Sequence, residues 1–220
     1  MVVELGLFSL IIALLLSGAQ AWFGLAGPAL GNARRVAAAR PAVAGQWVFV
    51  VMSFGVLAWA FYKNDFSVLY VASNSNSELP TFYRFTAVWG AHEGSLLLWA
   101  LALSTWSVAV GAFSKDLPET YAARLLGVLG VVSVGFQLFI LLTSSPFERL
   151  IPAAVDGRDL NPLLQDPALA IHPPMLYIGY VGFSVAFAFA VAALLEGRLD
   201  EKWARWAHPW TTLSWLFLTV

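Results

Sequence analysis

Two histidines stand among prolines, glycines and aromatic residues in patterns that could support chemistry. The first is His172, which is followed by Pro173 and Pro174 and then by a long apolar run. Proline is tolerated in the first turn of a helix, because the backbone amides there have no partner within the helix. The spacing therefore predicts that His172 is held at the stiff mouth of a helix. There it could cap or anchor the helix, or it could bind a metal or a cofactor.

The second pattern is the segment 89–95, which reads WGAHEGS and leads into two further tryptophans. His92, Trp99 and Trp106 are seven residues apart, so on a helix they form one aromatic stripe. Trp89 lies near the same stripe, and tryptophans at a membrane boundary are usually interface anchors. The deeper Trp99 and Trp106 suit either helix packing or one wall of a large apolar pocket.

Glu93 is the residue of this pattern that is costly to place in lipid. It should pair with a cation, carry a proton or stay at the watery boundary. Arg84 is the nearest candidate partner in the sequence. A structural role and a functional role for Glu93 are both open at this point.

The inventory of ligating residues limits the cofactor. The chain has no cysteine, which excludes disulfides, iron–sulfur clusters and thiolate zinc sites. Zinc usually needs three or four protein ligands, and beside the two histidines only Glu93 or Asp166 is available. Haem needs one or two axial ligands, an apolar aromatic floor, and cations for its propionates. The candidate cations are Arg84, Arg149 and Arg158. The residue types favour haem over zinc.

The elements that must position these residues are membrane helices. Hydrophobic residues make up 60% of the 220 residues and charged residues only 11%, a balance that indicates a lipid environment. Apolar runs of about 20 residues, the length that crosses a bilayer, cover 5–25, 43–62, 88–113, 121–143 and 174–195, and a sixth begins near residue 210. We predict an all-α, polytopic transmembrane helix bundle that forms a single membrane domain over residues 1–220. The net charge of −1 gives no indication of nucleic acid.

Two further groups of residues are interpreted as structural. Gly127, Gly130, Ser133 and Gln137 form one stripe of small and polar residues, which is typical of contact between membrane helices. His208 and Pro209 are expected to begin the sixth helix, far from the other histidines.

The loops between the runs predict the orientation. The first, third and fifth loops hold eight basic residues, whereas the longer second and fourth loops hold four. By the positive-inside rule, the odd loops are cytoplasmic and the N-terminus is outside. His92 and His172 then belong to the outer face. The proline-containing segment 144–172 is predicted to be an ordered, largely non-helical external loop.

The sixth run supplies 11 residues before the sequence ends, which is about 16 Å of helix. That length cannot cross a bilayer. The pattern predicts either a truncated chain or a subunit that another polypeptide completes.

Two stretches closely resemble one family of membrane proteins. Residues 83–99 read YRFTAVWGAHEGSLLLW, and residues 160–182 read LNPLLQDPALAIHPPMLYIGYVG. Both are similar to the CcmF family of cytochrome c maturation proteins and its nitrite-reductase-associated relatives, in the haem-handling membrane protein superfamily. The similarity runs from the first helix to Val220, as expected for the N-terminal portion of such a protein.

The resemblance implies a haem-binding subunit of a haem lyase (holocytochrome c synthetase) complex in the bacterial inner membrane. His172 matches the first of two histidines that ligate haem at the periplasmic face, where b-type haem is attached to the CXXCH thiols of apocytochrome c. Trp89, His92, Trp99 and Tyr177 become candidates for the haem pocket. The implied partners are CcmH- or CcmI-type thiol-handling subunits, the haem chaperone CcmE, apocytochrome c and quinol, besides membrane lipid.

One departure from the family pattern is large. The tryptophan-rich WWD signature, the second external histidine and the intramembrane haem ligands of the family are expected beyond residue 220. This chain therefore carries one axial ligand of a two-histidine site, and the segment alone is expected to be inactive. The rival hypotheses are a proton- or ion-coupled transporter subunit that uses Glu93, and a non-catalytic assembly scaffold.

Overall fold

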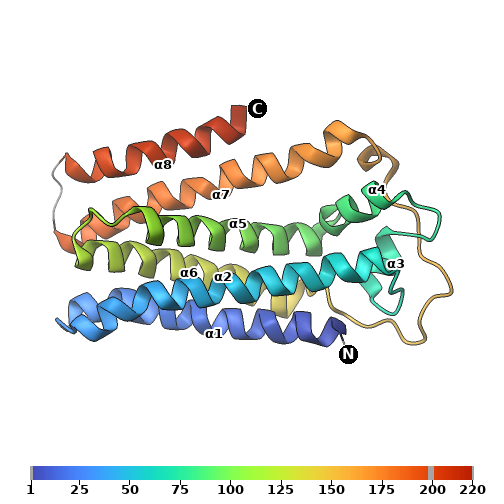
Figure 1. Cartoon of the computed structure of the whole chain (residues 1–220), viewed down its shortest axis with the longest axis horizontal. Helices are drawn as coiled ribbons and strands as arrows, with labels where there is room; N and C mark the ends of the chain where they lie inside the picture. The colour runs from blue at the N-terminus through green and yellow to red at the C-terminus, as the bar shows by residue number, and fades with distance from the viewer. Residues whose placement is uncertain (1, 198–200, 220) are drawn as a thin grey trace.

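The computed structural model of the chain describes residues 2–197 and 201–219, which form an elongated bundle of helices (Figure 1). Five of these helices are long and apolar enough to cross a membrane: α1 (Val2–Ala29), α2 (Ala33–Tyr62), α5 (His92–Phe113), α6 (Glu119–Thr143) and α7 (Pro167–Glu196). A further helix, α8 (Lys202–Thr219), runs back along α7. The predicted all-α membrane bundle is confirmed.

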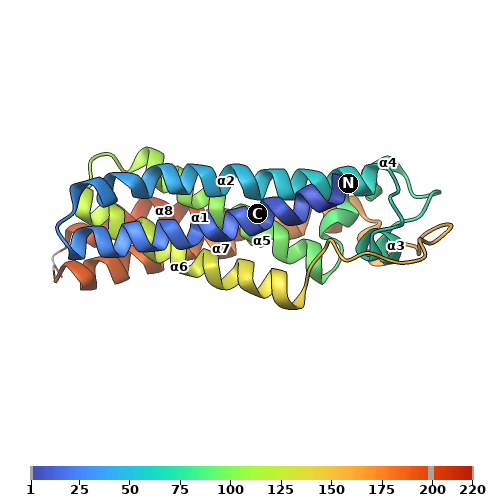
Figure 2. The ribbon, with the colours of Figure 1, turned by 90° about the horizontal axis from the view of Figure 1, so that it is seen from below.

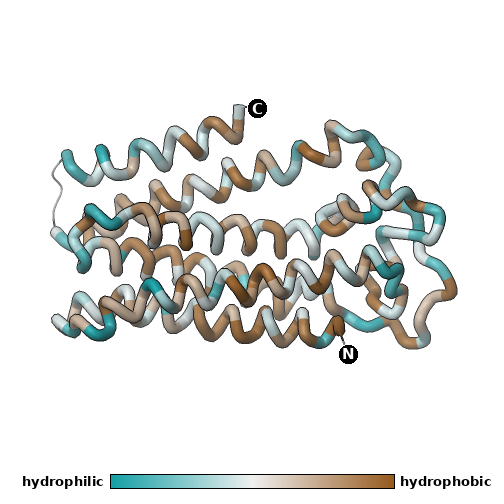
Figure 3. The backbone as a smooth tube through the Cα atoms, in the orientation of Figure 1, coloured by the Kyte–Doolittle hydropathy of each residue, from teal (hydrophilic) through white to brown (hydrophobic). Residues whose placement is uncertain are grey.

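The two ends of the bundle differ. One end, here called the loop end, carries the short helices α3 (Leu69–Asn74), α4 (Thr81–Thr86), η1 (Ala87–Trp89) and η2 (Pro162–Leu164), together with the connection 144–166. The other, the turn end, holds the turns at 30–32 and 114–118, and Figure 2 shows the same separation from a second direction. Hydrophilic residues gather at both ends and apolar residues along the helices between them (Figure 3). This pattern is expected of helices that cross a bilayer.

The start of α7 differs from the prediction. The helix begins at Pro167 instead of residue 174, because Asp166 caps it. The Asp166 carboxylate accepts hydrogen bonds from the backbone N–H groups of Ala168 and Leu169 at 2.9 and 3.1 Å, which satisfies amides of the first turn. The loop-end connection therefore covers 144–166, not 144–172. His172 lies inside the helix and not at its mouth.

The start of α2 also moves, from residue 43 to Ala33, so Arg34, Arg35 and Arg40 lie in the helix and not in a loop. Two further predicted boundaries move as well. The run predicted over 88–113 is divided, because α4 and η1 occupy residues 81–89 and α5 begins only at His92. The last helix begins at Lys202 instead of near residue 210. His208 and Pro209 consequently lie within α8, not at its start.

Small and polar residues hold α1 against α6. A Cβ atom built on Gly24 would lie 2.5 Å from the Cα atom of Gly127, so the two backbones meet with no room for a side chain. Nearby, the Ser17 hydroxyl donates a hydrogen bond to Oε1 of Gln137 at 3.0 Å, and both side chains are fully buried. The prediction that this stripe makes contact between helices is confirmed.

The connection 144–166 is tied to its neighbours by charged side chains. Arg149 donates to the carboxylate of Glu4 at the start of α1, with 3.0 Å between Nε and Oε1. Asp156 accepts from the backbone N–H and the hydroxyl of Ser77 at 2.9 and 2.6 Å. These hydrogen bonds from Ser77 hold the pKa of Asp156 below its usual range. The connection is thus an ordered cover over the loop end.

Candidate functional site

His172 is an exposed residue in the second turn of α7. It borders a shallow groove of about 510 Å³, whose other lining residues are Ala168, Leu169, Ile171 and Met175. An exposed imidazole beside an apolar surface can offer a ring nitrogen to a metal centre while a flat apolar ligand covers its neighbours. The groove is therefore the first candidate for a cofactor site.

The face of α7 that carries His172 continues into the contact with α8. Gly179 is seven residues further along and hence about 20° away around the helix. It packs against α8, since a Cβ atom at Gly179 would lie 2.8 Å from both Leu218 Cγ and the backbone oxygen of Ser214. The turn with His172 lies about 10 Å nearer to the loop end than the contact between Gly179 and α8. Toward the loop end, α7 extends further than the part of α8 drawn in Figure 1. The imidazole is thus accessible on the described bundle.

Trp89 supports the same turn of α7 from another side. Pro174 has no backbone N–H, so it leaves the carbonyl of Ala170 without its usual partner in the helix. The indole Nε1 of Trp89 donates a hydrogen bond to that oxygen at 3.0 Å. Ala170 is buried, whereas His172 two residues later is exposed. Trp89 therefore holds the backbone that carries His172 and does not line its groove.

Trp99 packs against α6 and α7, whereas His92, seven residues nearer the loop end, is exposed. The rings of His92 and Phe139 of α6 lie 6.2 Å apart, and the rings of Trp99 and Tyr177 of α7 lie 5.4 Å apart. The hydroxyl of Tyr177 is 3.5 Å from that of Ser95 on α5. Trp99 and Tyr177, two of the candidates for the haem pocket, therefore meet. They belong to the contact between α5 and α7, and neither they nor His92 lines the His172 groove.

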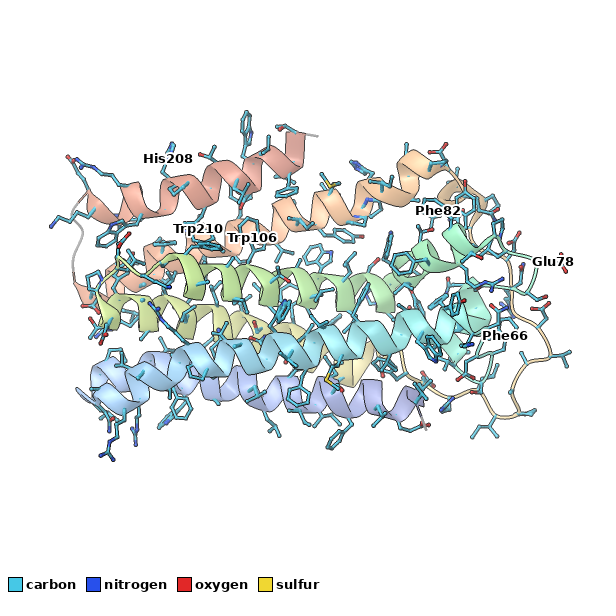
Figure 4. The ribbon with its side chains drawn as sticks, viewed as in Figure 1. Phe66, Glu78, Phe82, Trp106, His208 and Trp210 are labelled. Atoms are coloured by element: carbon cyan, nitrogen blue, oxygen red, sulfur yellow. The ribbon has the colours of Figure 1, made fainter. Side chains whose placement is uncertain are left out.

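Trp106 closes the deeper part of this contact. Its Nε1 donates a hydrogen bond to the backbone oxygen of Ile178 at 2.9 Å, and its ring lies 6.1 Å from that of Trp210 on α8. Figure 4 shows Trp106 and Trp210 together between the helices, with His208 pointing away from them. Trp106 has both roles that were left open for the deep tryptophans: it packs between the helices, and it also lines an apolar pocket of about 400 Å³ together with Ile178 and Phe217.

Arg84 and Glu93 do not form the expected pair within the part of the chain that the structure describes. Arg84 instead donates through its guanidinium to the backbone oxygens of Leu79 and Ser77, at 3.0 and 3.3 Å. Glu93 occupies the first turn of α5, where the free amides and the helix dipole stabilise a carboxylate. Both positions have a structural explanation.

Tyr70 and Gly94 organise the WGAHEGS segment, and the sequence interpretation assigned neither of them. The buried hydroxyl of Tyr70 donates to the backbone oxygen of Val88 at 3.1 Å and accepts from the N–H of Ala91 at 3.2 Å. Burial raises the pKa of Tyr70, which keeps the hydroxyl protonated and able to donate. A six-residue helix such as α3 shows no usable periodicity, so nothing in the sequence marked Tyr70. Gly94 must be a glycine because the backbone oxygen of Val88 lies where a Cβ atom would be. The sequence alone does not show this contact, because it depends on how η1 folds back onto α5.

The described residues 2–197 and 201–219 contain no group of three or more His, Asp or Glu side chains that could hold a metal ion. The zinc alternative therefore lacks a ligand set in this part of the chain. Of the two exposed histidines at the loop end, His172 is the one that borders an apolar groove, which suits a cofactor that takes one ligand from this chain, as haem can.

The fold and the site define a class of protein: a multi-pass helical membrane protein with two exposed histidines, His92 and His172, at its loop end. The chain belongs to the family described as Cytochrome C assembly protein, which its residues 89–220 match.

Named relatives agree with this assignment. The chain is 58% identical over 221 residues to the cytochrome c-type biogenesis protein CcmF of Pseudomonas aeruginosa, and 57% identical over 210 residues to CcmF of Escherichia coli. These alignments cover 100% and 95% of the chain but only 34% and 32% of the relatives. A solved structure named cytochrome c heme lyase CcmF matches with a TM-score of 0.88 and 30% identity, over 100% of this chain and 34% of that one. The chain thus corresponds to a portion of CcmF and spans about a third of the length of these proteins.

Proposed function

We propose that this chain is the haem-binding N-terminal portion of a cytochrome c maturation protein, which takes part in attaching haem to the CXXCH thiols of apocytochrome c. The relatives named CcmF and the matching structure named as a haem lyase support the pathway. The observation that carries the site is His172, which is exposed beside an apolar groove on α7. Because the chain spans a third of its relatives, the activity belongs to the larger assembly.

In this proposal His172 would hold b-type haem as a ligand of its iron. The apolar side chains of Leu169, Ile171 and Met175 would contact the haem and exclude water. When bound, haem supplies the vinyl groups that react with the apocytochrome thiols. The contribution of the protein is to orient the haem, since holding reactants in the correct geometry accounts for much of the rate of such a reaction.

Three of the remaining candidate pocket residues position α7 in this mechanism. Trp89 holds the Ala170 carbonyl, and Trp99 with Tyr177 fixes the next turns of α7 against α5. These three residues act through the helix that carries His172 and do not touch the haem. His92 is exposed at the start of α5, beside Phe139 of α6, and has no part in positioning α7.

The proposed setting is the bacterial inner membrane, with the loop end in the periplasm. The turn end carries Arg34, Arg35, Arg40, Lys115 and Arg124, so the positive-inside rule places it in the cytoplasm. The proposed partners are the haem chaperone CcmE, CcmH- or CcmI-type subunits, apocytochrome c and quinol. Partners that deliver haem or thiols would then approach the loop end.

The test is His172→Ala in the full-length protein in its native membrane. We expect loss of haem from the purified protein and at least a tenfold fall in c-type cytochromes on a haem-stained gel, with the protein still present in the membrane. His208→Ala is the matched control, because His208 is also an exposed helical histidine but lies in α8 nearer the turn end. Normal haem content and normal cytochromes in His172→Ala would show that the site is assigned wrongly.

A further inference from the structure

A second cavity lies at the turn end, between α2, the α5–α6 turn and the first turns of α6. Its volume is about 290 Å³. Charged side chains of Arg40, Lys115 and Glu119 line it, and Ala39, Ala123 and Leu126 are among its apolar lining residues. It is separate from the His172 groove, which lies at the opposite end of the bundle. Nothing in the proposed haem chemistry uses it.

The charges of this cavity favour an anion. Two cations face one carboxylate, and neither Arg40 nor Lys115 forms an ion pair among the residues that the structure describes. Both are therefore available to an external ligand. An arginine can bind phosphate oxygens through two parallel N–H groups, and a lysine can add a third donor.

The surroundings of the cavity are apolar and lie at the level of a membrane surface. Arg40 is about 10 Å from the start of α2, a depth at which headgroups and the first acyl carbons meet. Exposed apolar surface continues from the cavity along the same side of α2, where Val51, eleven residues from Arg40 and hence about 20° around the helix, is 38% exposed. Phe113, at the end of α5 beside the α5–α6 turn, is 80% exposed. A soluble anion would leave this apolar surface uncovered, whereas the acyl chain of a lipid would bury it.

We propose that this cavity binds the phosphate headgroup of an anionic phospholipid, with its acyl chains along this exposed apolar surface of α2. Basic pockets between membrane helices on the cytoplasmic side bind such headgroups in general. Here Arg40 and Lys115 hold the phosphate, and Glu119 weakens the site by repulsion. The lipid joins α2 to the α5–α6 turn at the end of the bundle opposite the haem groove. This inference is independent of the proposed function.

The experiment measures the binding of phosphatidylglycerol to the full-length protein, extracted in neutral detergent, by titration followed with native mass spectrometry. Each cation near a membrane surface contributes enough to change affinity about fivefold. Arg40→Gln with Lys115→Gln should therefore weaken the binding about 25-fold, while phosphatidylcholine binds weakly throughout. Glu119→Gln should strengthen it severalfold, a gain that a misfolded variant cannot give. Lys115→Arg keeps the charge and should retain binding.

The matched control is Arg34→Gln, which removes an exposed cation of the turn end that does not line the cavity. It should change the affinity less than twofold. An equal loss in Arg34→Gln would show that only the overall charge of the turn end matters, and would overturn the site. Displacement of the lipid by millimolar inorganic phosphate would assign the cavity to a soluble anion and would overturn the lipid as its ligand. Unchanged binding in Glu119→Gln would likewise contradict the proposal.

Discussion

At position 94 a glycine lies where the backbone of η1 turns back onto the first turn of α5. A Cβ atom built there would lie 1.7 Å from the backbone oxygen of Val88 and 2.5 Å from the hydroxyl of Tyr70. A backbone oxygen cannot move aside as the end of a flexible side chain can. The same oxygen accepts the Tyr70 hydrogen bond that orders the joint between η1 and α5. The second glycine of the WGAHEGS segment is thus explained by packing and not by catalysis.

Gly94→Ala is expected to destabilise the protein by about 2 kcal/mol, because the added methyl group must displace Val88 or Tyr70. The measurement is the unfolding free energy in mixed micelles titrated with denaturing detergent. Gly135→Ala is the matched control, since Gly135 lies on an exposed face of α6 and its Cβ would meet nothing within 4 Å. There the change should be neutral or stabilising by up to about 1 kcal/mol. Equal stability of the two variants would contradict the packing argument.

The sequence was informative about residue types and less so about their surroundings. It singled out His172 as accessible and Gln137 as a contact between helices, because both follow from polarity within apolar runs. It could not separate His172 from Trp89, Trp99 and Tyr177, which it grouped in one pocket. Their faces depend on where α7 begins and how it is rotated against α5, and both are set by packing across the bundle.

The first turns of α7 show how an element is stabilised despite proline. Pro173 and Pro174 lie inside the helix, and each removes a backbone hydrogen bond. Trp89 replaces one of these bonds by donating its indole N–H to the carbonyl of Ala170. Proline and tryptophan are therefore coupled, although they lie 85 residues apart in the sequence. The coupling fixes the turn on which His172 stands.

This coupling predicts the outcome of a double-mutant cycle. Trp89→Phe keeps an aromatic ring but loses the donor, so it should destabilise the protein by about 1–2 kcal/mol. In a Pro174→Ala background the backbone N–H of residue 174 can bond to Ala170, and Trp89→Phe should then cost about 1 kcal/mol less. The measurement is the unfolding free energy of the four proteins in detergent. Additive effects would show that the indole and the proline act independently.

The ends of the helices were the least predictable feature of the chain. For α7 the reason is that several residues could each have begun the helix. Pro167, Pro173 and Pro174 each suit the first turn of a helix, and the hydrophobic run alone favours the last of them. Asp166 decides between them, since it can accept hydrogen bonds from the amides that follow it. An aspartate directly before a proline was therefore a usable signal for the helix start. No comparable signal marks the start of α8 at Lys202. Charged residues in its first turns interrupt the hydrophobic run, and this part of the helix packs through Trp203 and Trp206.

At the scale of the whole molecule, the two proposed sites lie at opposite ends of the bundle. The loop end holds His172 with its groove and the ordered connection, and the turn end holds the cavity with its two cations. The number of spanning helices and their order could be predicted from hydropathy, because lipid leaves few alternatives to a helix. The orientation rests on loop charges alone. It decides whether the haem groove meets the periplasm, so it is the assumption with the widest consequences.

Residues 1–220 contain no cysteine, so a single cysteine introduced among them is the one thiol of this portion and can report its orientation. Val155→Cys places a thiol on a fully exposed residue of the loop-end connection, and Asp116→Cys places one on an exposed residue of the α5–α6 turn. With the loop end outside, a membrane-impermeant maleimide should label Val155→Cys in intact cells, and Asp116→Cys only after permeabilisation. Labelling of denatured protein controls for the reactivity of each thiol. The opposite pattern would put His172 on the cytoplasmic side, where cytochrome c thiols are not presented, and would contradict the proposed attachment of haem at the outer face.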